Sequence, residues 1–378
     1  VIDDKTFKVT MNAPTADFPQ RLGYSAFAPL PESAFDDMDA FGENPVGNGP
    51  YMLEEWNHNS NALLVPNPDY PGDHAAQNDG LDIVFYPSQD AAYAGLLSGN
   101  LDVLDQIPDS AFSVYESDLG DRAVNQPSAV FQSFTIGESL EHFGGEEGVL
   151  RRQALSHAIN REEITDTIFQ GTRTPAHDFT SPVVAGFSED VPGNEVLEYD
   201  PEKAKELWAQ ADEINEWSSP EFAIAYNSDG GHQAWVDAAA NSIKNTLEIE
   251  AVGAPYPDFK SLRDEVTNRT IETAFRTGWQ ADYPGMGNFL AALYGTGAGS
   301  NDGDYSNPDF DAKIREADAA GSPEEAAERF KEAQTILFED LPAIPLWYSN
   351  VTAGYSENVD NVVFGWDSVP IFTDITKN

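Results

Sequence analysis

The sequence predicts an α/β protein built from two lobes. The chain has 378 residues, more than one ordinary hydrophobic core accommodates. Segments with the alternating pattern of strands are followed repeatedly by segments with helical spacing, which is typical of α/β folds. No low-complexity linker separates the two series of elements. We therefore expect a hinge of crossing strands between the lobes rather than a flexible tether.

The composition indicates a folded and strongly acidic protein. Hydrophobic residues make up 40% and aromatic residues 11% of the chain, which excludes the disordered class. Lys and Arg number 20 against 65 Asp and Glu, so the formal net charge is -45. Such a charge repels phosphate backbones and argues against nucleic acid as a partner. Because the acids are spread along the whole chain, we interpret them as a solvated surface suited to saline or extracellular conditions, rather than as a device that steers cations.

The chain contains no Cys, which rules out disulfides, thiolate nucleophiles and Cys-ligated metals. No apolar run reaches the length of a membrane span, and the first residues, VIDDK, have none of the features of a signal peptide. We expect that any export or anchoring signal has been removed.

The expected elements follow from periodicity and from turn residues. In the first lobe we expect strands at residues 6–11, 51–56, 61–65, 81–86 and 101–104, and a helix at 89–97. In the second lobe we expect two helices within 148–169, helices at 232–247 and 323–338, and strands at 222–226, 275–279 and 344–348. Another helix begins at Asp200, with Pro201 at its first position.

A search for catalytic patterns finds none. The glycine-rich stretch 295–300 lacks a Lys and the strand-to-helix context of a phosphate loop. The six His residues show no HExxH spacing, and no GxSxG elbow is present. With 65 carboxylates in the chain, some acid–base pair could always be named, so that signal has no specificity. We predict no enzyme, no metal site and no cofactor.

Several sequence motifs occur in this chain in the same order as in one protein family. They read GNGPY at 47–51, NPDY at 67–70, SGNLD at 98–102, LRRQAL at 150–155, AINR at 158–161, YDPEKA at 199–204 and FRTGWQADYP at 275–284. Together they resemble the family 5 solute-binding proteins of ABC importers, the oligopeptide- and dipeptide-binding group.

The resemblance implies a two-lobed fold of the periplasmic-binding-protein type (type II, cluster C) with a strand-crossover hinge and an incomplete lobe I. It places lobe I at residues 1–128, lobe II at 129–348 and a return to lobe I at 349–378. In the family, a signal peptide, the first strands of lobe I and a small subdomain precede the strand expected at 6–11. We therefore expect this chain to be a C-terminal fragment.

The resemblance also implies the ligand site. Asp282 matches the family Asp that binds the α-ammonium group of a peptide, and a carboxylate in a closed cleft does need such a cation. Arg276 and His232 match residues near the ligand's C-terminal end, with a structural ion pair and a packing or capping His as the alternatives. Trp279 is expected to form a pocket wall, with core packing as its alternative. Tyr226 and Tyr348 are further candidates, and for both the core is the stronger alternative.

Taken together, we expect the extracytoplasmic component of an ABC importer, which binds peptides between its lobes and delivers them to the membrane permease. The alternatives keep the fold but change the ligand to an oligosaccharide, a nickel chelate or another small cation; an acidic secreted hydrolase is a weaker one. The resemblance further implies a monomer when the protein is full-length, anchored to lipid through a Cys ahead of this sequence.

Overall fold

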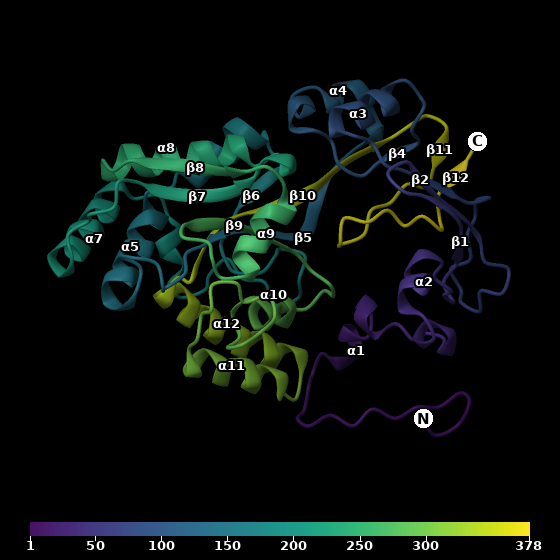
Figure 1. Ribbon diagram of the computed structural model, residues 1–378, viewed down its shortest axis with the longest axis horizontal. Coiled ribbons are helices and arrows are strands. Elements are labelled where there is room, and N and C mark those ends of the chain that lie inside the picture. Colours follow the sequence, from purple (N-terminus) through teal and green to yellow (C-terminus); the bar gives the residue numbers. More distant parts are fainter. The chain divides into compact units, whose positions relative to one another are not determined.

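The computed structural model describes residues 1–378, which divide into two units (Figure 1). The larger unit comprises Val1–Tyr24, Ala129–Ile168 and Arg173–Ser349; the smaller unit comprises Ser25–Ser128, Phe169–Thr172 and Asn350–Asn378. Two of the boundaries fall inside long strands, β5 (Ala123–Thr135) and β10 (Ala343–Tyr355). None of the helices is both long and apolar enough to cross a membrane.

A mixed sheet forms the centre of the larger unit. Its strands run in the order β10-β5-β9-β7-β8, with β6 paired to β10. β7 is parallel to both of its neighbours, whereas β5 and β9 are antiparallel. The strands that belong wholly to this unit are β6 (Arg173–Pro175), β7 (Phe222–Asn227), β8 (Ala251–Tyr256) and β9 (Ala274–Gln280).

Helices of the larger unit pack on this sheet and on one another. α8 lies along β7 and β8, whereas α10, α11 and α12 form a group of their own (Figure 1). The helices are α1 (Phe18–Arg21), α5 (Gly145–His157), α6 (Arg161–Ile164), α7 (Pro201–Ile214), α8 (Gln233–Leu247), α9 (Phe259–Thr267), α10 (Met286–Tyr294), α11 (Pro308–Asp318) and α12 (Pro323–Asp340). The predicted start of α7 is confirmed, because the Asp200 side chain accepts from the backbone N–H groups of Glu202 and Lys203.

Two groups of contacts in the core of the larger unit fix the positions of its helices and strands. Leu262 and Val266 of α9 pack with Ala225 of β7 and Phe275 of β9, which fixes α9 beside these strands. Farther along the sheet, the buried guanidinium of Arg161 donates to the carbonyl oxygens of Ser156, Leu197 and Pro345. Burial of this cation away from water lowers its pKa to about 9.

The smaller unit contains a three-stranded antiparallel sheet in the order β1-β2-β3. Its short strand β4 pairs with Gly354 and Tyr355 at the end of β10, and β11 pairs with β12. The elements are α2 (Met38–Glu43), β1 (Tyr51–Asn57), β2 (Asn61–Pro66), β3 (Leu81–Val84), α3 (Gln89–Leu97), β4 (Val103–Leu104), α4 (Tyr115–Leu119), β11 (Val359–Asp360) and β12 (Thr376–Lys377).

The structure differs from the sequence prediction at the start of the chain. Residues 6–11 are exposed and form no strand; the nearest pairing is an isolated bridge between Asp3 and Thr6. A strand is stable only with a partner along its edge, and this segment has none in the chain. Residues 1–24 also group with the larger unit rather than with the rest of 1–128. Arg21 holds them there through Asp318, with 2.6 Å between Nη2 and Oδ1.

Candidate functional site

The site is built on strand β9, whose two edges have different partners. On one edge, β5 pairs with β9 from Phe275 to Gln280. On the other edge, the ladder with β7 covers Ala274 and Phe275. The N–H of Ala281 donates to the carbonyl of Ala129, next to β5. Because backbone groups alternate along a strand, those of Arg276 and Gly278 point to the opposite edge. The Arg276 N–H still belongs to the ladder with β7, so the Arg276 carbonyl and the backbone groups of Gly278 are the ones beyond it.

Arg276 lies where β7 ends. Its Nε donates to the side-chain oxygen of Asn227 at 2.9 Å, and its guanidinium lies 5.3 Å from the centre of the Phe259 ring. Burial, together with the positive charge of Arg263, lowers the pKa of Arg276 to about 10. The Arg276 guanidinium therefore stays charged at neutral pH. Its hydrogen-bond partner at the end of β7 is the Asn227 amide and not a carboxylate.

His232 lies at the start of α8 and is electrically neutral. Burial lowers its pKa to about 3, and the positive charges of Arg276 and Arg173 act in the same direction. The indole N–H of Trp235 donates to Nδ1 of His232 at 3.1 Å. The ring proton of the neutral imidazole is therefore on Nε2, which can donate a hydrogen bond.

Trp279 and Asp282 are joined by Asn288 of α10, a residue that the sequence analysis did not single out. The Asn288 side-chain oxygen accepts from Trp279 Nε1 at 3.0 Å and from the backbone N–H of Asp282 at 2.8 Å. Its amide nitrogen donates to Asp282 Oδ2 at 2.9 Å. Within residues 1–378 no Lys, Arg or His forms an ion pair with the Asp282 carboxylate, so its negative charge is not neutralised by the protein.

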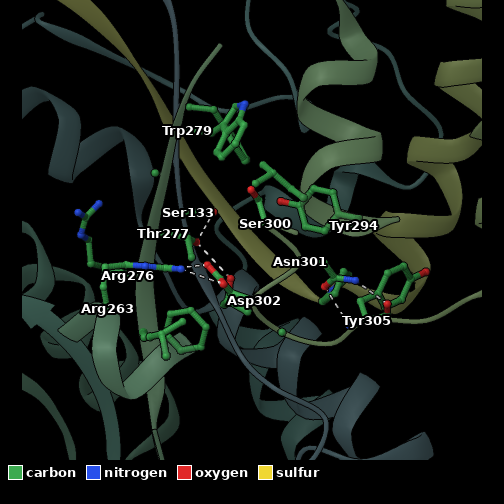
Figure 2. A pocket seen from close by; sticks show the side chains of 18 of the residues that line it. Ser133, Arg263, Arg276, Thr277, Trp279, Tyr294, Ser300, Asn301, Asp302 and Tyr305 are labelled. Carbon is green, nitrogen blue, oxygen red and sulfur yellow. Dashed lines mark hydrogen bonds and ion pairs between the residues drawn. The ribbon is translucent and has the colours of Figure 1, made fainter. Parts of the chain in front are cut away.

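A cavity of about 270 Å³ adjoins β9. Figure 2 shows Arg263 and Arg276 on one side of it and Tyr294 and Ser300 on the other. Its wall contains both apolar side chains and hydroxyl groups. The apolar ones include Phe131, Leu262, Val266, Phe275 and Trp279, and the hydroxyl groups include those of Ser133, Thr277, Tyr294 and Ser300.

Several polar side chains that line the cavity form hydrogen bonds with one another. Ser133 Oγ and Thr277 Oγ1 are 2.7 Å apart. Arg263 binds the Asp302 carboxylate through both terminal nitrogens, at 2.5 and 3.2 Å (Figure 2). Arg263 is therefore neutralised by a carboxylate, whereas Arg276 contacts the Asn227 amide and the Phe259 ring, neither of which is charged.

The structure places the six candidate residues in two groups. Arg276, Trp279 and Asp282 follow one another along β9 and its exit, and the charge of Arg276 acts on His232. Tyr226 and Tyr348 are buried, with 3% and 2% of their surfaces exposed. The Tyr348 hydroxyl accepts from the backbone N–H groups of His177 and Asp178, and burial raises its pKa well above the usual value. A ligand contact for either tyrosine stays a prediction.

Comparison with known proteins gives the family. The sequence profile of the bacterial extracellular solute-binding proteins, family 5 (middle region), matches residues 1–301. The chain belongs to this family. Family 5 proteins are solute-binding components of ABC importers that work outside the cytoplasm, so this chain is a solute-binding protein and not an enzyme.

The relatives of this family 5 chain are distant in sequence. The oligopeptide-binding protein OppA of Bacillus subtilis is 24% identical over 380 residues, which cover 96% of this chain and 67% of the relative. The heme-binding protein A of Haemophilus influenzae is 26% identical over 387 residues, with coverages of 97% and 68%. The chain thus spans about two thirds of the length of these relatives.

Solved structures confirm the fold expected for a family 5 protein. The murein tripeptide binding protein MppA of Escherichia coli superposes with a TM-score of 0.87 at 20% identity, covering 100% of this chain and 74% of the other. DppA of Helicobacter pylori, solved with the peptide STSA, gives 0.85 at 22% identity, with coverages of 100% and 73%. The α/β periplasmic-binding-protein fold is therefore established, and only part of it lies in this chain.

Proposed function

We propose that this chain binds peptides with a free ammonium end and belongs to a peptide ABC importer. The observation that carries the proposal is the Asp282 carboxylate, which Asn288 holds in place and which no cation of the protein neutralises. A partly desolvated carboxylate gains most from a charge-assisted hydrogen bond, and a peptide's ammonium group supplies one. Relatives named for oligopeptide and dipeptide binding support this ligand class.

The backbone of β9 supplies the second part of the proposal. An extended peptide that lies along the edge carrying the Arg276 carbonyl and the Gly278 backbone groups would form main-chain hydrogen bonds that do not depend on its sequence. The six steps from Arg276 to Asp282 correspond to about 20 Å at about 3.3 Å per residue. Since Arg276 remains charged and His232 can donate from Nε2, these two residues suit a C-terminal carboxylate at the far end. Ligands of up to about six residues fit this distance.

The cavity beside β9 supplies the third part. With about 270 Å³ of space it exceeds the volume of one large side chain, so water fills what a ligand side chain leaves open. Hydroxyl groups of Ser133, Thr277 and Ser300 give that water hydrogen-bond partners, while Phe131 and Trp279 give an apolar surface. Tolerance of varied side chains follows from this mixture.

The test compares a pentapeptide with its N-acetylated form by isothermal titration calorimetry, for the wild type and for Asp282→Asn. We expect Asp282→Asn to weaken binding of the free peptide by about 10- to 100-fold, because hydrogen bonds to charged groups contribute about 1.5–3 kcal/mol. Acetylation should weaken binding to the wild type by a similar factor and leave the variant's affinity nearly unchanged.

Asp190→Asn is the matched control, because Asp190 is an exposed acid of the same unit whose carboxylate makes no contact with the site. It should bind both peptides as the wild type does. Equal affinity of the wild type for the free and acetylated peptides would overturn the proposal. So would identification by mass spectrometry of a co-purified ligand without an ammonium group.

A further inference from the structure

A single buried amide connects the two residues of the site that a ligand's ammonium end would meet. Asn288 is 4% exposed and lies in the first turn of α10. Its side-chain amide makes three hydrogen bonds, all of them to Trp279 or Asp282. These partners precede it by nine and six residues, so the contacts come from the path of the loop between β9 and α10 and not from helical geometry.

The direction of the Asn288 amide is fixed by its partners. Trp279 Nε1 and the backbone nitrogen of Asp282 can only donate, so the amide oxygen must face both of them. The amide nitrogen then faces Asp282 Oδ2, where it can only donate. An Asp at this position would turn an acceptor toward a carboxylate, and an aliphatic residue would leave two partly buried N–H groups without partners.

We propose that Asn288 is the positioning residue of the ligand site: it sets the direction of the Asp282 carboxylate and of the Trp279 indole. Because Oδ2 of Asp282 is taken by Asn288, Oδ1 is the oxygen left to receive an ammonium group. This inference rests on the proposed function. It adds that recognition of the ammonium end depends on a residue that does not itself touch the ligand.

A purely structural role makes a different prediction. Asn288 also ties the loop 281–285 to α10, so its loss costs stability in either case. If it only held the loop, its replacement would lower the unfolding midpoint without changing how the protein discriminates free from acetylated peptides. If it positions Asp282, its replacement removes that discrimination.

The experiment uses Asn288→Leu, which keeps the size of the side chain and removes its polar atoms. We measure affinities for the free and N-acetylated pentapeptides and take their ratio. The ratio should fall from about tenfold or more in the wild type to below about threefold in the variant. A variant that keeps the wild-type ratio overturns the inference.

Gln334→Met is the matched control. Gln334 is another buried side-chain amide whose oxygen accepts a backbone N–H, from Phe179 at 2.7 Å, and whose nitrogen faces a carboxylate, Asp178. Its replacement should lower the unfolding midpoint and keep the wild-type ratio. If Asn288→Leu does not fold, Asn288→Ser is measured in the same way, with a reduced ratio expected and an unchanged ratio again counting against the inference.

The result also separates this inference from the function on which it rests. A wild type that does not discriminate free from acetylated peptide overturns the proposed function. A wild type that discriminates, with an Asn288→Leu variant that discriminates equally well, overturns only the role of Asn288.

Discussion

At the scale of single residues, His232 shows how burial, together with neighbouring arginines, keeps an imidazole neutral. Burial and the two nearby arginines hold the pKa of His232 at about 3, far below the value of about 6.5 for a free imidazole. His232 is therefore neutral at neutral and at mildly acidic pH. It adds a hydrogen-bond donor beside the charge of Arg276 without adding a second charge.

This pKa shift predicts the pH dependence of stability. Below pH 6.5 the unfolded chain takes up a proton at His232 that the folded protein does not, so stability falls as the pH decreases toward 3. Relative to His232→Gln, the wild type should lose up to about 1.4 kcal/mol of unfolding free energy per pH unit below pH 6.5. Urea titrations between pH 7.5 and 4.5 measure the difference, and parallel curves for the two proteins would contradict it.

The sequence predicts which residues belong to the candidate site better than it predicts the residues that contact them. Trp279 and Asp282 are predicted as site residues because they stand in a recognisable motif. Asn288 stands in the same stretch but gives no signal of its own, since its importance lies in three hydrogen bonds that only the folded loop creates. Asn227, which binds Arg276, was missed for the same reason: the two residues are far apart in the chain and meet at the end of β7.

At the scale of elements, the edge of β9 governs how a peptide would bind. Backbone groups alternate in direction along an extended strand, so only every second amide of the ligand can donate to β9. A scan of N-methylated pentapeptides should therefore alternate, with strong losses of affinity at one set of positions and weak losses between them. A competition assay against the unmodified peptide reads out the pattern, and uniform effects along the peptide would argue against strand pairing.

Helices and paired strands were well predicted where the signal is local. α3, α8 and α12 begin and end within a few residues of the positions expected from caps and periodicity, and α7 begins where its cap predicts. Residues 6–11 have an equally good alternating pattern and still form no strand. An alternating pattern of apolar and polar residues indicates only that one face of the segment suits burial. A strand also requires a neighbouring strand to pair with, and the tertiary structure decides whether there is one.

At the scale of the whole molecule, the net charge of -45 dominates the electrostatics. Most ion pairs are partly exposed, and Lys and Arg are too few to offset the carboxylates. Self-repulsion of like charges destabilises the folded state. Dissolved salt reduces that repulsion, because the screening length falls from about 10 Å at 0.1 M to about 3 Å at 1 M.

We therefore expect the thermal unfolding midpoint to rise by several degrees between 0.1 and 1 M NaCl, since each kcal/mol corresponds to about 2–4 °C for proteins of 150–250 residues. Circular dichroism at fixed pH measures the midpoint, and KCl should act like NaCl. A constant or falling midpoint would show that the acidic residues do not limit stability.

The division of the chain also bears on the order in which it folds during synthesis. Each unit is assembled from three separate stretches of sequence, so no single truncation yields either unit whole. Strand β4 (Val103–Leu104) pairs with Gly354 and Tyr355, which are made much later in the chain. On the ribosome, the residues of β4 must therefore wait, without their final partners, until Gly354 and Tyr355 have emerged.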